Sequence, residues 1–435
     1  MKSNLTILTI VVTVLLTNQA NAQQDYQLRD YFAVATADQA APTAFSSYVG
    51  DLDVASVGLQ KSGKGCNQGC SCSTCNGLDL FGRMFVSGEF MHWYSKGRSL
   101  PPLVTSSPTG TNANVAGVLD ANRQPVPGQS SIRFGGQDYG GDRQSGGRAT
   151  IGMSLDEQGE RAIGFRGFVV EGQSLLFTAS STNGDPILAR PFYNDDPLVN
   201  APDALVVGHP TVSQFGSISL KADHDVYGGQ AFVRKLLDCG RNYRLDLIGG
   251  YRYDNIHDDL AITTFIQTAA NTFTYNDLFD VKNEYNAGEL GLLGEIYRDC
   301  WTFSFLTKIG LGNMKQVALI NGEHIITGGG ATQGLGGLLT QPTNINSYER
   351  DLLVWAPEAN FKLSYAYSDR LSITVGYSFL YWTRVAFAGD QIDYNVNGTQ
   401  LNGGTPVIGA MTPAFNWRDT DYWVQTVDIG GSINY

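Results

Sequence analysis

The sequence predicts an all-β protein: a transmembrane antiparallel up-and-down β-barrel of about ten strands, with ten to twelve as the range. Three observations lead to this fold class. Segments of roughly ten residues alternate between apolar and polar positions, the connections between them differ in length in a regular order, and the chain opens with an export signal. We therefore expect short periplasmic turns and long extracellular loops.

The first 22 residues have the features of a cleavable signal peptide. Lys2 is the only early charge, Leu5–Leu16 is apolar apart from threonines, and Ala20-Asn21-Ala22 forms an A-x-A cleavage site. We expect the mature chain to begin near Gln23. An uncleaved membrane anchor is the alternative, but the apolar stretch is short for a spanning helix.

Residues 23–80 are predicted to form a flexible periplasmic segment that contains cysteines, and residues 81–435 the barrel. The segment is rich in Ala, Ser, Gln and Asp and shows little periodicity. The net charge of −12 argues against nucleic acid and anionic lipid as main partners. Abundant glycine (51 residues), with 21 Tyr and 21 Phe, favours β structure with loops.

Ten segments show the alternation of a half-buried strand. They are residues 83–94, 148–156, 161–172, 226–237, 243–254, 286–297, 301–312, 351–367, 371–382 and 421–435. In the fifth, every second residue from Tyr243 to Tyr253 is apolar, aromatic or glycine, and the intervening set carries Arg244, Asp246, Arg252 and Asp254. Period two indicates a strand, with the apolar face toward lipid in a barrel or toward the core in a soluble sandwich.

The connections decide between these two architectures. Four are turns of about three to five residues, and the other five, near 95–147, 173–225, 255–285, 313–350 and 383–420, are long and rich in Gly, Asn, Thr and Pro. Sorting of loops by length is typical of outer-membrane barrels. Aromatic residues near the segment ends, such as Trp93, Trp301 and Trp382, suit two interfacial girdles.

The last segment ends in an aromatic residue, as expected of a barrel that the insertion machinery recognises by its terminal strand. The predicted insertion signal consists of Val427, Ile429, Ile433 and Tyr435. An ordinary final strand is the alternative interpretation.

The chain from Phe81 to its end resembles the seventh putative beta-barrel porin family, which is common in planctomycete bacteria. The resemblance is carried by "GEFMHWY", "YRLDLIGGYRYDNI", "GLLGEIY" followed by "FLTKIGLGNMKQVALING", and "YSDRLSITVGYSFLYWTRV" ahead of "GDQID". It implies an outer-membrane barrel in the bacterial envelope. It implies no catalytic residue and no established substrate.

With the apolar face toward lipid, charges of both signs point into the lumen. An isolated charge on the lipid face would cost about 2–4 kcal/mol at the midplane. The predicted lumen charges are Glu89, Arg166, Arg234, Arg244, Asp246, Arg252, Asp254, Glu289, Glu295, Lys308, Glu358, Lys362 and Asp428. Because barrels of about eight strands are filled by their own side chains, a salt-bridged packing network is favoured over a narrow passage for small solutes.

The cysteines predict disulfide bonds, because the exported compartment is oxidising. Cys66, Cys70, Cys72 and Cys75 crowd together before the first strand and are expected to form two disulfides, with a zinc site as the alternative. Cys239 and Cys300 lie in two short turns on one rim. Their expected separation of roughly 10 Å exceeds the Cα distance of about 7 Å that a disulfide allows, so a bond between them requires turn flexibility.

Two other functions remain open. His257-Asp258-Asp259, with Asn194-Asp195-Asp196 from another loop, could form a surface hydrolase at the long-loop rim. The long loops could instead serve adhesion or binding. His209, His224 and His324 show no metal spacing, and the sequence contains no common catalytic motif, so no cofactor is expected. The expected partners are outer-membrane lipid, the barrel-insertion machinery and small solutes; the oligomeric state stays open.

Overall fold

The computed structural model describes residues 84–328, 332–404 and 406–434. The predicted signal peptide, the periplasmic segment 23–80 with Cys66, Cys70, Cys72 and Cys75, and Tyr435 lie outside the described residues. In the described part, no helix is long and apolar enough to cross a bilayer.

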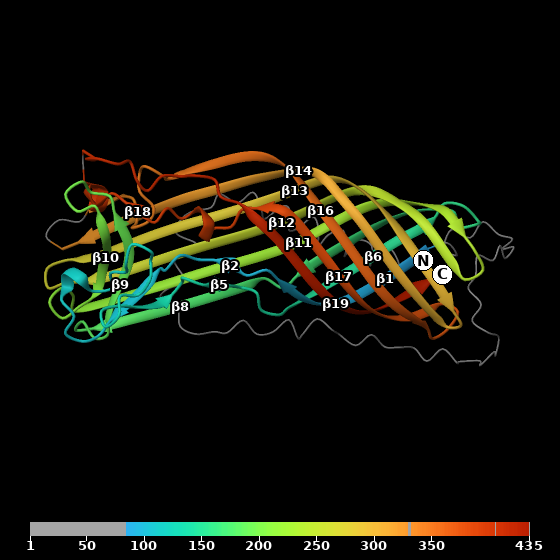
Figure 1. The fold of residues 1–435 in the computed structure, drawn as a ribbon, viewed down its shortest axis with the longest axis horizontal. Helices are drawn as coiled ribbons and strands as arrows, with labels where there is room; N and C mark the ends of the chain where they lie inside the picture. Colours follow the sequence, from blue (N-terminus) through green and yellow to red (C-terminus); the bar gives the residue numbers. More distant parts are fainter. Residues whose placement is uncertain (1–83, 329–331, 405, 435) are drawn as a thin grey trace, which may run out of the picture. The chain divides into compact units, whose positions relative to one another are not determined.

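Ten antiparallel strands form the wall of a closed barrel, which confirms the predicted fold (Figure 1). They are β1 (Met84–Ser95), β6 (Gln144–Ser154), β7 (Arg161–Val170), β11 (Phe215–Cys239), β12 (Tyr243–Gln267), β13 (Thr272–Arg298), β14 (Trp301–Thr327), β16 (Asn346–Ala366), β17 (Leu371–Val385) and β19 (Thr420–Asn434). Each strand pairs with the next, and β19 pairs with β1, where Phe85 lies opposite Asn434. The described ends of the chain therefore meet at the short-turn rim.

The four predicted short turns are present between β6 and β7, β11 and β12, β13 and β14, and β16 and β17. The tightest contains Asp299, whose φ of 53° lies in the left-handed region, where aspartate is tolerated better than most residues. The prediction of a long loop at 255–285 is wrong. Strands β12 and β13 extend to Gln267 and from Thr272, so only four residues, 268–271, connect them.

Strands β11 to β14 are 25 to 27 residues long, whereas a membrane crossing needs about 9–11. Their extra length explains the error, because the apolar face changes sides along each strand. In β12 the outward Tyr251 is exposed and the inward Arg252 buried, but further along the inward Ile256 and Leu260 are buried apolar residues. The outward positions there carry polar residues such as His257. One half of the strand thus faces lipid and the other faces water.

The apolar band is clearest on the outer face of β14. Trp301, Phe303, Ile309 and Leu311 are exposed there, and the next outward residues are Asn313 and Lys315. The ring of Trp301 lies 4.9 Å from that of Tyr365 on the neighbouring strand. These aromatic residues mark the short-turn edge of the band.

Placing a charge at the centre of this band is expected to destabilise the barrel. Thr307→Arg exposes a guanidinium to lipid and should lower the free energy of unfolding by about 2–4 kcal/mol. Leu319→Arg lies on the same face of the same strand, beyond the band, and should change it by less than about 0.5 kcal/mol. Urea unfolding in lipid vesicles measures both. Equal effects of the two variants would contradict the position of the band.

In its long-loop half the barrel wall is an open sheet. Strand β8 (Gln173–Thr182) continues the line of β7 and pairs with β11 through Ala222↔Leu175 and Ile218↔Ala179. The order of strands here is β8-β11-β12-β13-β14-β16, with the short β15 (Thr332–Leu335) beside the end of β14. The ladder between β16 and β17 ends at Glu358↔Leu380, so the part of β16 that precedes Glu358, called the upper part of β16 below, is the second edge of this open sheet.

A second sheet packs on the inner face of this open half and is called the plug below. It consists of β3 (Val104–Ser107), β4 (Ser131–Phe134), β9 (Ile187–Asn194), β10 (Ala201–Gly208) and β18 (Asn395–Val396). The remaining short elements are β2 (Arg98–Ser99), β5 (Asp138–Tyr139), η5 (Ala113–Val115), η6 (Gly389–Gln391) and η7 (Gly398–Gly403).

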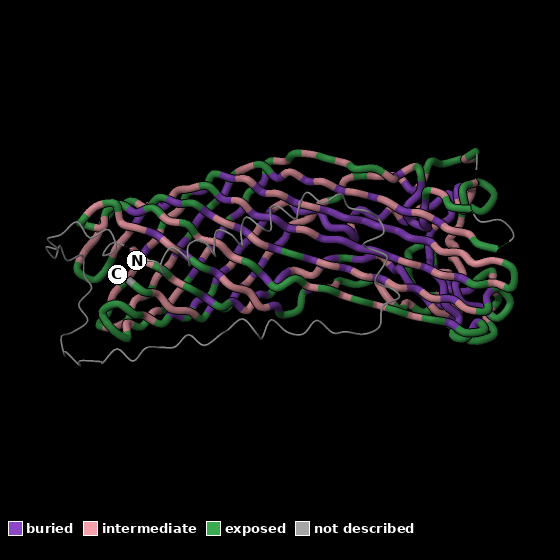
Figure 2. The backbone as a smooth tube through the Cα atoms, turned by 180° about the vertical axis from the view of Figure 1, so that it is seen from behind, coloured by how far each residue is buried: buried purple, intermediate pink, exposed green. Residues whose placement is uncertain are grey.

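The plug and the wall share one apolar core. Leu188, Phe192 and Val207 of the plug belong to the same buried cluster as Leu260 and Phe279 of the wall. Buried residues accordingly concentrate in the half of the barrel away from the chain ends (Figure 2). Burial of this apolar surface explains why the inward positions of β11 to β13 become apolar beyond the membrane band.

Candidate functional site

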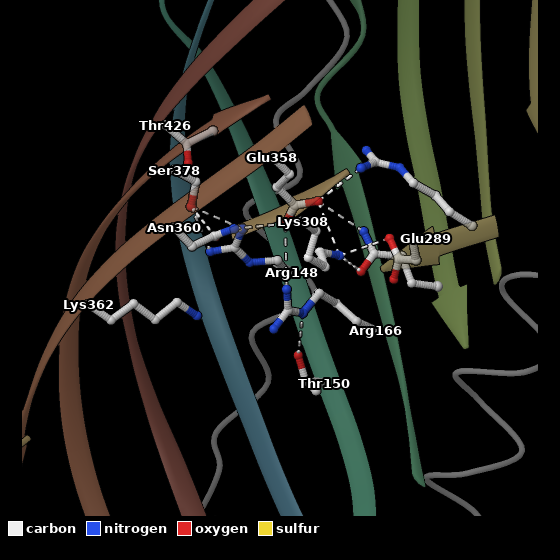
Figure 3. A network of polar contacts seen from close by, with 12 residues as sticks. Arg148, Thr150, Arg166, Glu289, Lys308, Glu358, Asn360, Lys362, Ser378 and Thr426 are labelled. Atoms are coloured by element: carbon white, nitrogen blue, oxygen red, sulfur yellow. Dashed lines mark hydrogen bonds and ion pairs between the residues drawn. The ribbon is translucent and has the colours of Figure 1, made fainter. Parts of the chain in front are cut away.

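Nine of the predicted lumen charges converge in one ion-paired layer within the membrane band, called the charge layer below. They are Glu89, Arg166, Arg252, Asp254, Glu289, Lys308, Glu358, Lys362 and Asp428. Figure 3 shows the part of the layer around Glu358. They come from β1, β7, β12, β13, β14, β16 and β19. Alternation turns each side chain inward, and the barrel's closure brings them together.

Glu358 is the carboxylate with the most cationic partners in this layer. Its Oε2 accepts from Nη1 of Arg252 at 2.9 Å and lies 3.3 Å from Nζ of Lys308. Nη1 of Arg166 lies 3.7 Å from Oε1. Nζ of Lys308 also donates to Oε2 of Glu289 at 3.0 Å, and Nε of Arg252 donates to Oδ2 of Asp254 at 2.6 Å.

Arg148 of β6 joins the remaining charges to this group. It donates through Nε to Oε2 of Glu89 at 2.6 Å and through Nη2 to Oδ2 of Asp428 at 2.7 Å. Its Nη1 donates to Asn360, whose own amide donates to Glu358 at 2.7 Å. Lys362 pairs with the other oxygen of Glu89.

The charge layer is balanced and nearly filled. Five basic and five acidic side chains take part: Arg148, Arg166, Arg252, Lys308 and Lys362 with Glu89, Asp254, Glu289, Glu358 and Asp428. The cavity beside them, lined by Trp93, Arg166 and Glu358, measures about 30 Å³. Because a water needs about 10–15 Å³ by this measure, the cavity has room for about two waters.

The other four predicted lumen charges form a smaller group nearer the short-turn rim. Nε of Arg244 donates to Oδ2 of Asp246 at 2.8 Å, and Nε of Arg234 lies 3.7 Å from the same oxygen. Glu295 stands opposite Arg244 in the ladder and accepts from the hydroxyl of Tyr297. Asp246 is fully buried, whereas Arg234, Arg244 and Glu295 are half-buried.

Arg148 is not among the predicted lumen charges, although its position in the sequence carries a signal. Arg148 opens a predicted strand in which Ala149, Ile151 and Met153 form the outward face, so the same alternation turns it inward. The neutral partners Asn360, Ser378 and Gln230 could not be singled out. Alternation turns many uncharged polar residues toward the lumen, and only the register of the strands identifies these three as part of the charge layer.

Two buried carboxylates of the wall hold segments that lie inside the barrel, and the first of them, Asp277, anchors the plug. Asp277 of β13 accepts from Nη1 of Arg190 in β9 at 2.7 Å and from the backbone N–H groups of Leu339 and Thr340 at 2.8 and 2.9 Å. The hydroxyl of Thr340 donates to it as well, at 2.8 Å. Arg190 and Asp277 are both almost inaccessible to solvent.

The second carboxylate is Asp258 of β12. Oδ1 lies 3.0 Å from Nε of Arg98 in β2 and 3.4 Å from Nδ1 of His224, while Oδ2 accepts from the backbone N–H of Ala388 at 2.9 Å. Nε2 of His224 lies 3.1 Å from the hydroxyl of Tyr422. These contacts tie the first and last long connections to the middle of the wall.

The predicted catalytic group His257-Asp258-Asp259 does not assemble. All three residues lie in β12 and not in a loop, so alternation sends Asp258 into the core and the other two to the outer face. There Nε2 of His257 lies 2.8 Å from Oδ1 of Asp280. Asn194 and Asp195 serve the plug instead, with Asn194 contacting Asp203 and Asp195 contacting Thr412. Among the described residues no cluster suited to a metal ion occurs.

The predicted disulfide between Cys239 and Cys300 is wrong, because Cys239 carries a free thiol. The predicted insertion residues Val427, Ile429 and Ile433 are exposed on the outer face of β19. Their role in insertion stays a prediction.

A half-buried carboxyl in the loop 386–419 makes the stability of the protein depend on pH. Burial raises the pKa of Asp390 to about 6, and the nearby Asp258 carboxylate adds to the rise. Unfolded aspartate titrates near pH ~3.9, so between about pH 4 and 6 the folded state holds more protons. Stability therefore falls as the pH rises through this window.

Asp390→Asn is expected to stabilise the protein at pH 8 by about 1–2 kcal/mol, since Asp390 is half-buried and solvent screens part of the effect. The gain should disappear near pH 4. Thermal unfolding in detergent at pH 4, 6 and 8 measures it, with Asp369→Asn in an exposed turn as the control. A gain of the same size at every pH would contradict the assigned cause.

Comparisons with known proteins give one family match and several distant structural likenesses. The family described as "Putative beta barrel porin-7 (BBP7)" matches residues 85–435. No curated protein matches the chain. The outer membrane protease OmpT from Escherichia coli is 11% identical with a TM-score of 0.39, covering 84% of this chain and 100% of that one. The translocator domain of the autotransporter NalP from Neisseria meningitidis is 11% identical with a TM-score of 0.24, covering 81% and 89%.

A FadL homologue from Pseudomonas aeruginosa is also similar, at 7% identity and a TM-score of 0.22, covering 81% of this chain and 90% of that one. At these scores the likenesses say nothing about activity or substrate.

Proposed function

The chain belongs to the putative beta barrel porin-7 family of outer-membrane barrels, and we propose that it is a structural outer-membrane protein whose lumen is closed at rest. The observation that carries the proposal is the balanced charge layer with its cavity of about 30 Å³. A hydrated ion or a sugar does not fit through such a space. The plug adds a second closure on the long-loop side.

The balance of charge also argues against an ion-selective pore. Selective linings carry a large excess of one sign, whereas this layer pairs five cations with five anions. Paired charges hold each other in place through charge-assisted hydrogen bonds. The layer thus acts as packing that is compatible with a narrow barrel.

A narrow passage for small solutes is the second candidate, and one observation favours it. Nη2 of Arg252, Oδ1 of Asp254 and Oε1 of Glu289 are buried without a hydrogen-bond partner among the described residues. Such groups are usually satisfied by water. A file of waters along them would be the starting point for a passage that opens when the plug moves.

Catalysis is not part of the proposal. The family is named for porins and the predicted catalytic triplet is divided between two faces of β12. Adhesion through the long loops would be compatible with a closed barrel, since it needs no lumen.

The closed lumen predicts silence in a planar bilayer. Protein whose folded state is verified by heat-modifiable migration should give no stepwise currents at neutral pH, because the charge layer fills the cross-section. A heat-unfolded sample of the same preparation is the control for leak. Regular current steps from the folded sample, with an amplitude that scales with salt, would contradict the closed state and favour the porin.

A further inference from the structure

We propose that the free edge of β8 is a docking site for an extended segment of another polypeptide, which adds as a strand to the extracellular half of the wall. This goes beyond the proposed function and does not depend on whether the lumen conducts. The proposal rests on unpaired backbone groups, on incomplete burial of the inner face of β8, and on the residues that line this edge.

The backbone of β8 is paired on one side. Among the described strands β8 pairs with β11 alone, through ten consecutive partners from Gln173↔His224 to Thr182↔Phe215. The other backbone hydrogen bonds of the described residues include none from residues 174–181. In an antiparallel ladder alternate residues point their N–H and C=O groups to opposite sides, so about half of these groups face an edge where no described residue pairs with them.

The inner face of β8 shows that a neighbour is missing. Ile218, Leu220 and Ala222 of β11 are 1%, 1% and 2% exposed. Their ladder partners, in the same order, are Ala179, Phe177 and Leu175, and all three are half-buried. Phe134 of the plug, with its ring 4.8 Å from that of Phe177, lies beside them and is half-buried too. An added strand with apolar inward residues would cover this surface.

The outer face of β8 is suited to a soluble partner. Ser174, Leu176, Thr178 and Ser180 are exposed there, with Leu176 at 66%, and most of them are polar, as expected beyond the membrane band. The partner segment should therefore alternate, with apolar residues turned toward Phe177 and polar residues turned toward water.

The two edges of the open sheet differ in how they are protected. The upper part of β16 carries Glu349, Arg350 and Asp351, and residues of the last loop cover it, with Phe415 stacked on Tyr348 at 3.7 Å. Charges and covering loops are the devices that keep edges from pairing. From Gln173 to Thr182, β8 has neither a charge nor a proline. The short contact of Arg98 with Gln173, at 3.1 Å, closes only its lower end.

A second copy in the same membrane does not fit this edge. Two barrels that share a bilayer point the same way, so their β8 strands would run parallel and tilt in opposite directions about a two-fold axis along the membrane normal. Such strands cross and cannot form a ladder. A separate extended segment has no such restriction and can pair in the antiparallel direction.

The test uses the full-length protein in lipid nanodiscs and a synthetic peptide with the sequence of residues 215–225, the natural partner of β8 on its other side. Amide hydrogen exchange should show the fast half of the β8 amides becoming slow when the peptide is added, with no change in β11 or at the β16 edge. The same peptide with N-methyl groups at alternate residues should have no effect, because it cannot complete the ladder.

A matched pair of variants locates the contact. Ala179→Asp places a charge on the half-buried inner face and should weaken peptide binding at least tenfold, whereas Ser180→Asp on the outer face should leave it unchanged. Heat-modifiable migration shows that each variant is folded, and the methylated peptide tests the edge without any variant. Slow exchange of the edge-facing half of the amides of residues 174–180 before peptide is added would overturn the proposal. Absence of binding, or protection that grows with protein concentration alone, would do the same.

Discussion

Replacing Glu358 by alanine is expected to lower the free energy of unfolding by about 3–5 kcal/mol, the usual cost of removing one partner from a buried ion pair. The variant leaves Arg252 and Lys308 facing each other without their shared carboxylate, at side-chain exposures of 1% and 2%. Glu358→Gln keeps the shape but not the charge and should cost nearly as much. Urea unfolding in lipid vesicles, followed by heat-modifiable migration, measures both variants.

Strand β16 offers a matched control for this experiment. Glu349 also pairs with a lysine, Lys315 at 3.3 Å, but the two side chains are 59% and 42% exposed. Glu349→Ala should change the stability by less than about 1 kcal/mol, as is usual for surface pairs. Similar losses for the two variants would show that the charge layer is hydrated and that the lumen is open to water.

Replacing Asp277 by alanine is expected to release the plug from the wall. It removes four hydrogen bonds, from Arg190, Leu339 and twice from Thr340, and leaves the buried guanidinium of Arg190 unpaired. Loss of this pair should cost about 3–5 kcal/mol. Amide exchange in β9 and in residues 336–345 should accelerate by the factor that corresponds to this loss of free energy, while exchange in the membrane half of β13 stays slow.

Asp223→Ala is the control for the plug variant. Asp223 pairs with Lys221 on the outer face of β11, where the side chains are 23% and 40% exposed, so the expected loss is below about 1 kcal/mol. If Asp277→Ala left the exchange of β9 unchanged, the apolar core alone would hold the plug, and Asp277 would have no anchoring role.

The membrane half of the fold could be predicted from the sequence because lipid imposes one simple rule on it. Most outward residues of a spanning strand are apolar, so alternation alone located Tyr243–Asp254 and placed Arg252 and Asp254 on the opposite face. The same rule also turns the side chain of Arg148 inward, but Arg148 stands at the start of its segment and was not predicted as a lumen charge. No rule of this kind gives the pairing Arg148–Asp428, because it depends on the order in which strands close the barrel.

The water-exposed half could not be predicted for an equally physical reason. Beyond Asp254 the apolar residues of β12 change sides, so a search for outward apolar positions ends there and assigns the rest to a loop. Alternation within a strand could not predict the plug, because the plug is held by contacts between distant parts of the chain. Arg190 and Asp277, for example, are 87 positions apart in the sequence. The triplet His257-Asp258-Asp259 was interpreted as a catalytic group because it was assigned to a loop, where neighbouring side chains can point to one place. In a strand, the side chains of successive residues point to opposite faces.

The change of face within β11, β12 and β13 also fixes how deep the barrel sits in the bilayer. Moving the protein outward would leave the environment of Ile256 unchanged, because Ile256 is buried inside the barrel in a cluster with Trp382 and Tyr422. It would, however, draw the outward-facing Tyr251 and Leu290 from lipid into water. Moving it inward would press the outward-facing Lys282 and Glu284 into hydrocarbon. Either displacement is opposed on several strands at once, so the sequence itself determines the depth at which the barrel lies in the bilayer.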